Sequence, residues 1–356
     1  MEVINRIMSY VFVILFLFTT VSMAFSWAPI AVADNIPLSV NPLVNSTAYP
    51  QNITVHTGDL ILTNNDVLLI KDAQLNLKGN LRMNGNSTLI LDNGTLYPDF
   101  GKGQFSYTLH DNAKITMQKG SDIESLIFDF ILYDNSSINI LDSKLSQNIR
   151  LDSINATLQA VNSSIRVATI YGDSSFINSS LSDLNFYGNA RIVNSHIEQF
   201  EVSSLYRPIH VDLVNSTYDR VNTDFIGQGV IRVYWYLTVL VESQGTPVQD
   251  AIVQIYAQAN NSLVAEQNAT SEGKAQFELP ALEISEHGET QTSEYTIRVN
   301  QNQTQVQENV TLNASMEKTV SLSADLQIII FAVIAVIVIL VVVVFLIFLF
   351  RKKRKQ

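Results

Sequence analysis

The side chains of this 356-residue chain that best suit catalysis are aspartates in its middle third. Paired carboxylates can act as general acid and base on a glycosidic bond, and clusters of them can bind calcium. The candidates are Asp129, Asp134, Asp142, Asp152, Asp173 and Asp183. Nearly all of them stand beside Asn, Ser or Gly, where a carboxylate commonly accepts backbone N–H groups at a turn. We therefore expect turn roles for these aspartates and assign no catalytic residue.

Metal-binding and nucleophilic motifs are absent from the sequence. The chain has no cysteine, which excludes disulfides, iron–sulfur clusters and thiol nucleophiles. The histidines show no metal-ligand spacing, and there is no nucleophile elbow, glycine-rich phosphate loop or EF-hand loop. We therefore expect no cofactor and no metal site. The five histidines are His56, His110, His196, His210 and His287.

Two of these histidines, His196 and His210, lie 14 residues apart, close to one structural repeat. They could stack on adjacent repeats, although a pair of partly exposed polar side chains is the simpler interpretation.

Asparagine is the other residue type whose spacing suggests chemistry, because its side-chain amide accepts an oligosaccharide in the motif N-x-S/T. Fourteen of the 31 asparagines stand in this motif, all between two apolar terminal segments, and we predict glycosylation there. Asparagine is also a natural turn residue, so turn chemistry is a second explanation for part of the excess. The fourteen are Asn45, Asn52, Asn86, Asn93, Asn135, Asn155, Asn162, Asn178, Asn215, Asn260, Asn268, Asn302, Asn309 and Asn313.

A short repeat predicts the fold of the middle of the chain. An Asp or Asn, a small polar residue, any residue and an apolar residue recur at steps of 20, 16, 16 and 21 residues, starting at Asp142, Asn162, Asn178, Asn194 and Asn215. Steps of this size suit one coil of a parallel β-solenoid. Aliphatic side chains would point inward, and corner Asn and Ser residues would adopt left-handed backbone and stack into hydrogen-bonded ladders. An antiparallel sandwich or barrel is the alternative.

Four aromatic residues surround Gly101-Lys102-Gly103, which we expect to form a loop inserted into this region: Tyr97, Phe100, Phe105 and Tyr107. Exposed rings could stack on sugars, whereas rings that cover the open side of a solenoid would complete its core. We favour the second role.

Two segments resemble known kinds of domain. The stretch NITVHTGDLILTNNDVLLIKDAQLNLKGNLRMNGNSTLILDNGTLY, from Asn52 to Tyr97, resembles the β-helix regions common in microbial, especially archaeal, surface proteins. The segment 234–322 resembles the carboxypeptidase regulatory-like domains, which are small sandwiches of prealbumin or immunoglobulin type. That family usually supplies a spacer or an adhesive unit, and the resemblance brings no catalytic residue. It is carried by Gly245, Pro247, Val248, Ala251, Val253, Ile255, Thr270, Gly273, Ala275, Phe277, Leu279 and Pro280.

The C-terminal apolar segment predicts a transmembrane helix. All residues from Ile328 to Phe350 are apolar, and as a helix they would span about 34 Å, against a hydrocarbon core of about 30 Å. We expect the helix over 326–350. The basic residues of the final segment, 351–356, resist translocation and attract anionic lipid headgroups, which predicts a cytoplasmic tail.

The N-terminal segment predicts a secretory signal peptide over 1–33. Arg6 precedes an apolar run, and Ala31-Val32-Ala33 suits a cleavage site. Cleavage near Ala24 and an uncleaved anchor are alternatives. With the basic tail inside, a β-helix region (34–226) and a sandwich (234–322) would lie outside the plasma membrane, as in a single-pass type I protein.

Composition adds to this expectation. The net charge of −11, from 22 basic and 33 acidic residues, argues against nucleic-acid binding. An exterior chain without cysteine but with many glycosylation motifs fits an archaeal envelope. The expected fold is mostly β: a parallel β-helix plus a small β-sandwich, with an N-terminal signal helix and one C-terminal transmembrane helix.

We expect a membrane-anchored, glycosylated surface protein with a structural or adhesive, glycan-binding role. Its expected partners are membrane lipids, through the C-terminal helix and basic tail, and envelope glycans or S-layer proteins. A membrane-tethered enzyme, similar to polysaccharide lyases or hydrolases, is one alternative. An exterior subunit of a surface complex is another.

Overall fold

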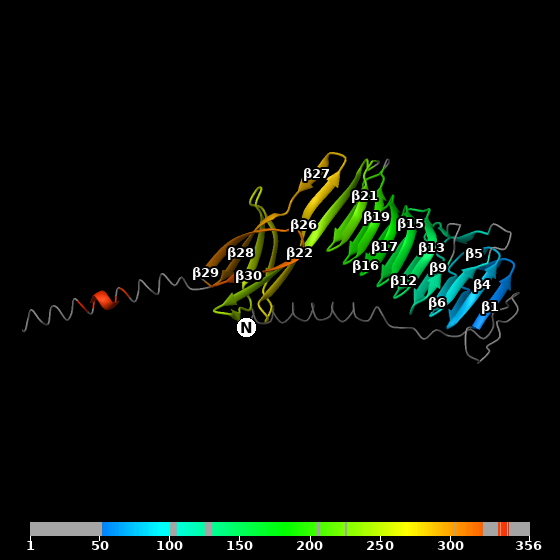
Figure 1. The fold of residues 1–356 in the computed structure, drawn as a ribbon, viewed down its shortest axis with the longest axis horizontal. Coiled ribbons are helices and arrows are strands. Elements are labelled where there is room, and N and C mark those ends of the chain that lie inside the picture. The colour runs from blue at the N-terminus through cyan, green and yellow to red at the C-terminus, as the bar shows by residue number, and fades with distance from the viewer. Residues whose placement is uncertain are drawn as a thin grey trace, which may run out of the picture. The chain divides into compact units, whose positions relative to one another are not determined.

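The computed structural model describes residues 52–99, 105–124, 130–204, 207–224, 226–302 and 304–322, and six helical residues of the C-terminal apolar segment, Ile334, Val336–Ile339 and Val341. The predicted signal peptide and basic tail lie outside the described residues, as does most of the predicted transmembrane helix. Within the part of the chain that the structure describes, no helix is both long and apolar enough to cross a membrane. The described chain is mostly β with large parallel sheets, as predicted (Figure 1).

The strands from β1 to β22 wind in successive coils, each stacked on the one before it (Figure 1). The first four coils have three strands each: β1 (Asn52–Thr57), β2 (Leu60–Leu62) and β3 (Val67–Lys71); β4 (Ala73–Lys78), β5 (Leu81–Met83) and β6 (Thr88–Asp92); β7 (Thr95–Pro98), β8 (Tyr107–Leu109) and β9 (Lys114–Gln118); β10 (Asp122–Ile123), β11 (Phe130–Leu132) and β12 (Ser137–Leu141). The next five have two strands each: β13 (Lys144–Leu151) and β14 (Thr157–Val161); β15 (Ser164–Ile170) and β16 (Asp173–Ile177); β17 (Ser180–Phe186) and β18 (Ala190–Val193); β19 (His196–Val202) and β20 (Ile209–Val214); β21 (Thr217–Asn222) and β22 (Gly229–Ser243).

The change from three strands to two takes place at β13. Its first residues, Lys144 and Leu145, pair with β10, and its last residues pair with β11 through Ile149 and Phe130. One long strand therefore continues two columns of short strands. The pairings between coils are parallel throughout, from β1 with β4 to β20 with β22. This excludes the antiparallel sandwich or barrel for the coiled region.

Inward-facing side chains form apolar columns that run from coil to coil. One column, aligned by strand register, lies in the sheet that contains β9 and β20, and each of its members is at most 6% exposed. A single coil cannot enclose such side chains, so each coil is stabilised by its neighbours, at about 1.5–3 kcal/mol for each large side chain fully buried. The column consists of Met117, Ile140, Ala160, Phe176, Ile192, Leu213 and Val233.

The corner residues of the repeat have left-handed backbone, which Asn and Asp tolerate better than other residues with a side chain. The φ angle is 48° at Asp142, 50° at Asn162 and at Asn178, 49° at Asn194 and 46° at Asn215. Their side chains bond along the stack. Asn162 Nδ2 donates to Asp142 Oδ1 at 3.0 Å, and Asn178 Nδ2 donates to Asn162 Oδ1 at 3.2 Å. The predicted ladder of corner side chains is confirmed.

The serine that follows each corner residue forms a second, buried ladder. Ser179 Oγ accepts the backbone N–H of Ser163 at 3.2 Å and donates to the carbonyl of Ile177 at 2.8 Å. Ser195 Oγ accepts the N–H of Ser179 at 2.9 Å in the same way. Each serine therefore satisfies a buried donor of the preceding coil, and Asn-Ser recurs because the two residues perform different tasks at one corner.

Beyond the last coil, two layers of strands pack around a second core. One layer contains the end of β22 with β23 (Thr246–Pro247), β26 (Lys274–Ser285), β27 (Gly288–Gln291) and β30 (Met316–Ser321). The other is antiparallel, in the order β25 (Leu263–Asn268), β24 (Ile252–Ala257), β28 (Glu294–Gln301) and β29 (Thr304–Thr311). Val239, Val253, Leu279, Ile297 and Leu312 are fully buried between them.

Strand β22 belongs to both parts. Residues 229–234 stack in parallel on β20, and residues 237–242 pair in parallel with β30. Residues 231–240 also pair with the antiparallel β26. The strand begins at Gly229, within the interval 227–233 left between the predicted β-helix region and the predicted sandwich, and it continues without interruption into the second part.

The serine ladder generates a stability prediction. Replacing Ser179 with Ala leaves the buried N–H of Ser163 without its acceptor, which costs about 1–3 kcal/mol. We expect Ser179→Ala to lower the unfolding free energy of the full chain by that amount in urea titrations. The matched control is Ser182→Ala, at a half-buried position of β17, with an expected change below about 0.5 kcal/mol. Equal effects of the two changes would contradict a role for the ladder.

Candidate functional site

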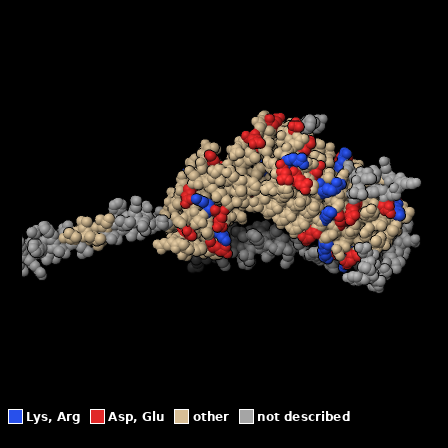
Figure 2. Space-filling view, viewed as in Figure 1, with Lys and Arg blue, Asp and Glu red and all other residues tan. Residues whose placement is uncertain are grey.

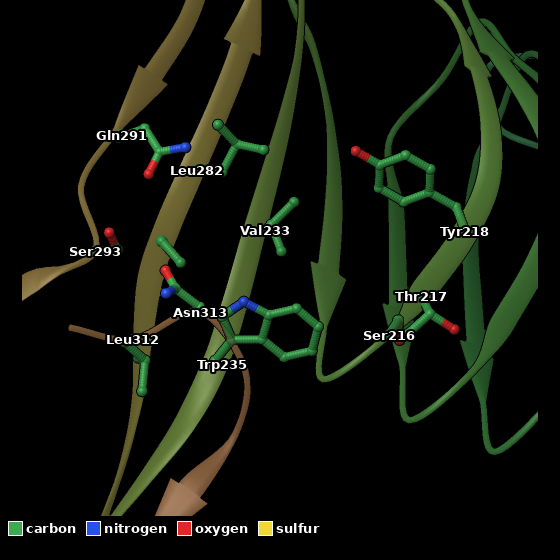
Figure 3. Close-up of a pocket in the computed structure, with 11 residues that line it drawn as sticks. Ser216, Thr217, Tyr218, Val233, Trp235, Leu282, Gln291, Ser293, Leu312 and Asn313 are labelled. Carbon is green, nitrogen blue, oxygen red and sulfur yellow. The ribbon is translucent and has the colours of Figure 1, made fainter.

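A groove lies where the last coil meets the second part, and it encloses about 300 Å³ (Figure 3). It is lined by residues of four strands and their neighbouring turns. Because β21 has no described strand stacked beyond it, while β22 continues into the next sheet, a gap opens between β21 and the β26–β27 hairpin. The described lining residues are Ser216, Thr217, Tyr218, Val233, Trp235, Ala281, Leu282, Gln291, Ser293, Leu312 and Asn313.

Two aromatic rings set the shape of the groove. Trp235 on β22 is half-buried and packs against both apolar cores. Tyr218 on β21 stands edge-on to Phe200, with ring centroids 5.5 Å apart, and its hydroxyl points into the groove from the opposite wall (Figure 3). Each ring is therefore held by packing on one side and faces the groove on the other.

The polar groups of the groove stand at its rim. The carboxamide of Gln291, on β27, is exposed and points into the opening (Figure 3). Asn313 is exposed too, and Ser293 is buried beside it, where its carbonyl accepts the N–H of Leu312 at 2.8 Å. Ser216 belongs to the serine ladder, since its Oγ accepts the N–H of Ser195 at 3.0 Å. Gln291 and Asn313 are therefore the amides best placed to meet a ligand.

The groove is electrically neutral at its surface. Among the described residues that line it, none is Asp, Glu, Lys, Arg or His. Burial raises the pKa of the Tyr218 phenol, and the nearby Glu289 carboxylate raises this pKa further. The phenol therefore keeps its proton at neutral pH and can both donate and accept a hydrogen bond.

Ion pairs fix the opposite face of β22. Arg232 makes two bonds to the Asp212 carboxylate, at 2.7 and 3.0 Å, and Arg191 makes two to Glu278, at 2.7 and 3.0 Å. The bonds to Glu278 raise the pKa of Arg191. The second pair joins β18 of the solenoid to β26, so it links the two parts on the face of β22 opposite the groove. Figure 2 shows acidic and basic side chains close together on much of the face that it draws.

The aspartates singled out by the sequence lie apart, at corners and on strands. Asp142 Oδ1 accepts Asn162 Nδ2, Asp173 Oδ1 accepts Asn189 Nδ2 at 3.1 Å, and Asp134 Oδ2 accepts the N–H of Asp111 at 3.0 Å. Asp152 pairs with Arg150 at 2.8 Å.

Asp183 is half-buried on β17, and Asp129 lies outside the described residues. No two of the described candidates are brought into one site by these contacts.

The possible stacking of His196 and His210 on adjacent coils is wrong. His196 is on β19 and His210 on β20, in different sheets, because 14 residues are fewer than one coil. His196 instead contacts the next coil, where its Nδ1 lies 2.9 Å from Thr217 Oγ1. In the stretches that the structure describes, no three His, Asp or Glu side chains gather as a metal site would require.

The aromatic residues near the predicted loop divide into two groups. Tyr107 is buried against Phe130, with ring centroids 5.8 Å apart, so it completes the core as favoured above. Tyr97 is 36% exposed and Phe105 is half-buried. Phe100 lies outside the described residues.

The asparagines of the glycosylation motifs are at the surface wherever the structure describes their exposure. Asn215 is half-buried, Asn52 begins β1, and Asn45 lies outside the described residues. The exposed ones are Asn86, Asn93, Asn135, Asn155, Asn162, Asn178, Asn260, Asn268, Asn302, Asn309 and Asn313.

Sequence reasoning missed the groove, because its lining comes from segments between residues 216 and 313 that share no motif. It also missed a second corner column, for which a sequence pattern existed: Tyr171-Gly172-Asp173 recurs 16 residues later as Tyr187-Gly188-Asn189. The two tyrosine rings stack at 4.5 Å. A Cβ on Gly172 would lie 1.8 Å from the carbonyl oxygen of Ala156, so only glycine fits there.

No protein-family model matches the chain, and no curated protein sequence matches it.

The corner role of Asp142 can be tested by two substitutions. Asp142→Asn keeps an acceptor oxygen and a residue that tolerates left-handed backbone, so we expect less than about 0.5 kcal/mol loss of unfolding free energy. Asp142→Ala loses the bond from Asn162 and places alanine at a φ of 48°, at a cost of about 1–2 kcal/mol. Chemical denaturation of the full chain measures both. Equal losses would show that the charge, rather than the corner geometry, is what the position requires.

Proposed function

We propose that the chain is a single-pass, N-glycosylated protein of the cell surface with a structural or adhesive role in the envelope. In this proposal a signal peptide directs residues 34 onward across the membrane, the helix over 326–350 anchors the chain, and the basic tail stays in the cytoplasm with anionic lipids as its contacts. The two-layered second part is a sandwich of the carboxypeptidase regulatory-like type, which spaces the coiled part from the lipid.

The observation that carries the proposal is the surface position of the glycosylation motifs. The asparagines whose exposure is described are exposed or, for Asn215, half-buried, and every motif lies between the two apolar terminal segments. An oligosaccharyltransferase requires asparagines that are accessible at the surface and that lie on the exterior side of the membrane. Envelope glycans or S-layer proteins are the partners that the proposal implies.

Turn chemistry accounts for part of the same asparagine excess. Asn93, Asn162, Asn178 and Asn215 occupy ladder corners, where the side-chain amide bonds to the adjacent coil. Asn268 on β25 and Asn309 on β29 are exposed and lie outside the coiled part, so corner geometry does not explain their motifs. These motifs support glycosylation more directly than the ladder motifs do.

The solenoid carboxylates favour a structural role over the alternative of a carbohydrate-active enzyme. Retaining and inverting glycosidases need two carboxyl groups facing one bond, about 5–9.5 Å apart. Asp142 and Asp173 instead accept amide protons from neighbouring coils.

The topology can be tested because the chain has no cysteine. Gln305→Cys, exposed on β29, and Gln356→Cys, in the tail, each give one thiol. In intact cells we expect a membrane-impermeant maleimide to label Gln305→Cys and to leave Gln356→Cys unlabelled. After permeabilisation both should react, which serves as the control for accessibility.

Labelling of the tail but not of β29 in intact cells would reverse the proposed orientation. Labelling of both thiols in intact cells would contradict the proposed membrane anchor. A protein whose mass did not change on enzymatic removal of N-linked glycans would contradict the glycosylation part alone.

A further inference from the structure

The groove between β21 and the β26–β27 hairpin combines an apolar floor with a polar rim. Trp235 and Tyr218 offer rings, and Val233, Leu282 and Leu312 make the rest of the floor apolar. Above this floor stand carboxamides and hydroxyl groups. A ligand that fits must therefore be flat and apolar on its faces and rich in hydrogen-bonding groups at its edges.

The absence of charge among the described lining residues limits the class of ligand further. The described lining residues carry no ionised side chain, so an anionic ligand such as a phosphate or a uronate would be buried without a partner. The charge that lies nearby is negative, since Glu289 is close enough to raise the pKa of Tyr218. An anion would be repelled, and a cation would find no carboxylate lining the groove.

The size of the groove suits a small molecule. Its volume of about 300 Å³ is at the lower end of the range of about 300–1,000 Å³ typical of ligand pockets. The β26 wall is held from behind, because the Arg191–Glu278 ion pair joins β26 to β18 at 2.7 Å. On the rim, Ser315 Oγ donates to Asn215 Oδ1 at 2.7 Å and accepts the N–H of Tyr236 at 2.9 Å. Little reorganisation is needed before binding, which favours affinity.

We infer that this groove is a binding site for a neutral saccharide of one or two pyranose rings. The apolar face of a sugar ring packs on Trp235, its hydroxyl groups bond to the amides of Gln291 and Asn313, and the Tyr218 hydroxyl meets it from the other wall. The inference rests on the proposed surface role for the source of the ligand, which is an envelope glycan. No bond is made or broken, so the site serves attachment.

The chain contains two tryptophans, Trp27 in the proposed signal peptide and Trp235 in the groove, so Trp27→Phe leaves Trp235 as the only tryptophan whether or not the signal peptide is removed. We expect the emission of this full-length protein to shift in a saturable way on titration with neutral methyl glycosides of glucose, galactose, mannose or N-acetylglucosamine, or with their disaccharides. Galacturonate should produce no saturable shift. Gln291→Ala should weaken binding about two- to tenfold, as expected for the loss of one hydrogen bond.

The matched control is Gln276→Ala, which replaces an exposed glutamine on the opposite face of β26. We expect this variant to bind the sugars with unchanged affinity. Because Gln291 is exposed, its replacement is not expected to disturb folding, and an unchanged unfolding midpoint verifies this. Asn313→Gln removes the glycosylation motif and keeps a carboxamide at this position. Binding that appears only in this variant would place the chain's own sugar, on Asn313, in the groove, and would support the site.

Three results would overturn the inference: no saturable shift with any neutral sugar either with Asn313 or with Asn313→Gln, preference for the uronate, or equal affinity in Gln291→Ala and Gln276→Ala. None of these depends on the maleimide labelling. The two experiments therefore distinguish failure of the proposed topology from failure of the proposed sugar site.

Discussion

Strand β22 pairs its backbone with four other strands, β20, β23, β26 and β30, and the arrangement of both parts of the described chain depends on this. Its first residues complete the last coil on β20, its last residues pair with β30, and β26 covers the free edge along most of its length. An open edge of a parallel stack would be a template for association with another chain, and β26 removes that edge. Side chains alternate along β22, so Arg232 and Tyr234 face the ion pairs while Val233 and Trp235 face the groove.

The two ends of the solenoid are completed differently. At the C-terminal end one sheet continues through β22 into the second part, while the other stops at β21, and the groove is the space left by that mismatch. The first coil, at the other end, carries outward apolar side chains that are about half exposed. They are Ile53, Val55, Ile61, Val67 and Leu69.

The solenoid could be predicted from the sequence where the interactions that form its corners are between neighbouring residues. The Asn-Ser pair of each coil requires left-handed backbone at Asn178 and its equivalents and a buried hydroxyl at the next residue, so the corner is encoded in adjacent letters. The coils before β13 were predicted from the resemblance of residues 52–97 to β-helix regions, but the third strand in each of these coils was not predicted. The groove could not be foreseen either, because Tyr218, Trp235 and Gln291 meet only through pairings between distant strands. The corner asparagines also raise the number of glycosylation motifs. A motif therefore indicates glycosylation, rather than a corner, only at positions outside the coils, such as Asn268.

Hydrogen–deuterium exchange along β22 in the full chain is the most direct measurement of the central claim, that one strand joins the two cores. The account predicts that the amides of residues 230–241 are protected together with those of β20 and β26, and exchange by one cooperative opening. If residues 230–234 exchanged with the solenoid while residues 237–241 opened independently and faster, the two parts would be separate units. The shared strand, and with it the walls of the groove, would then be contradicted.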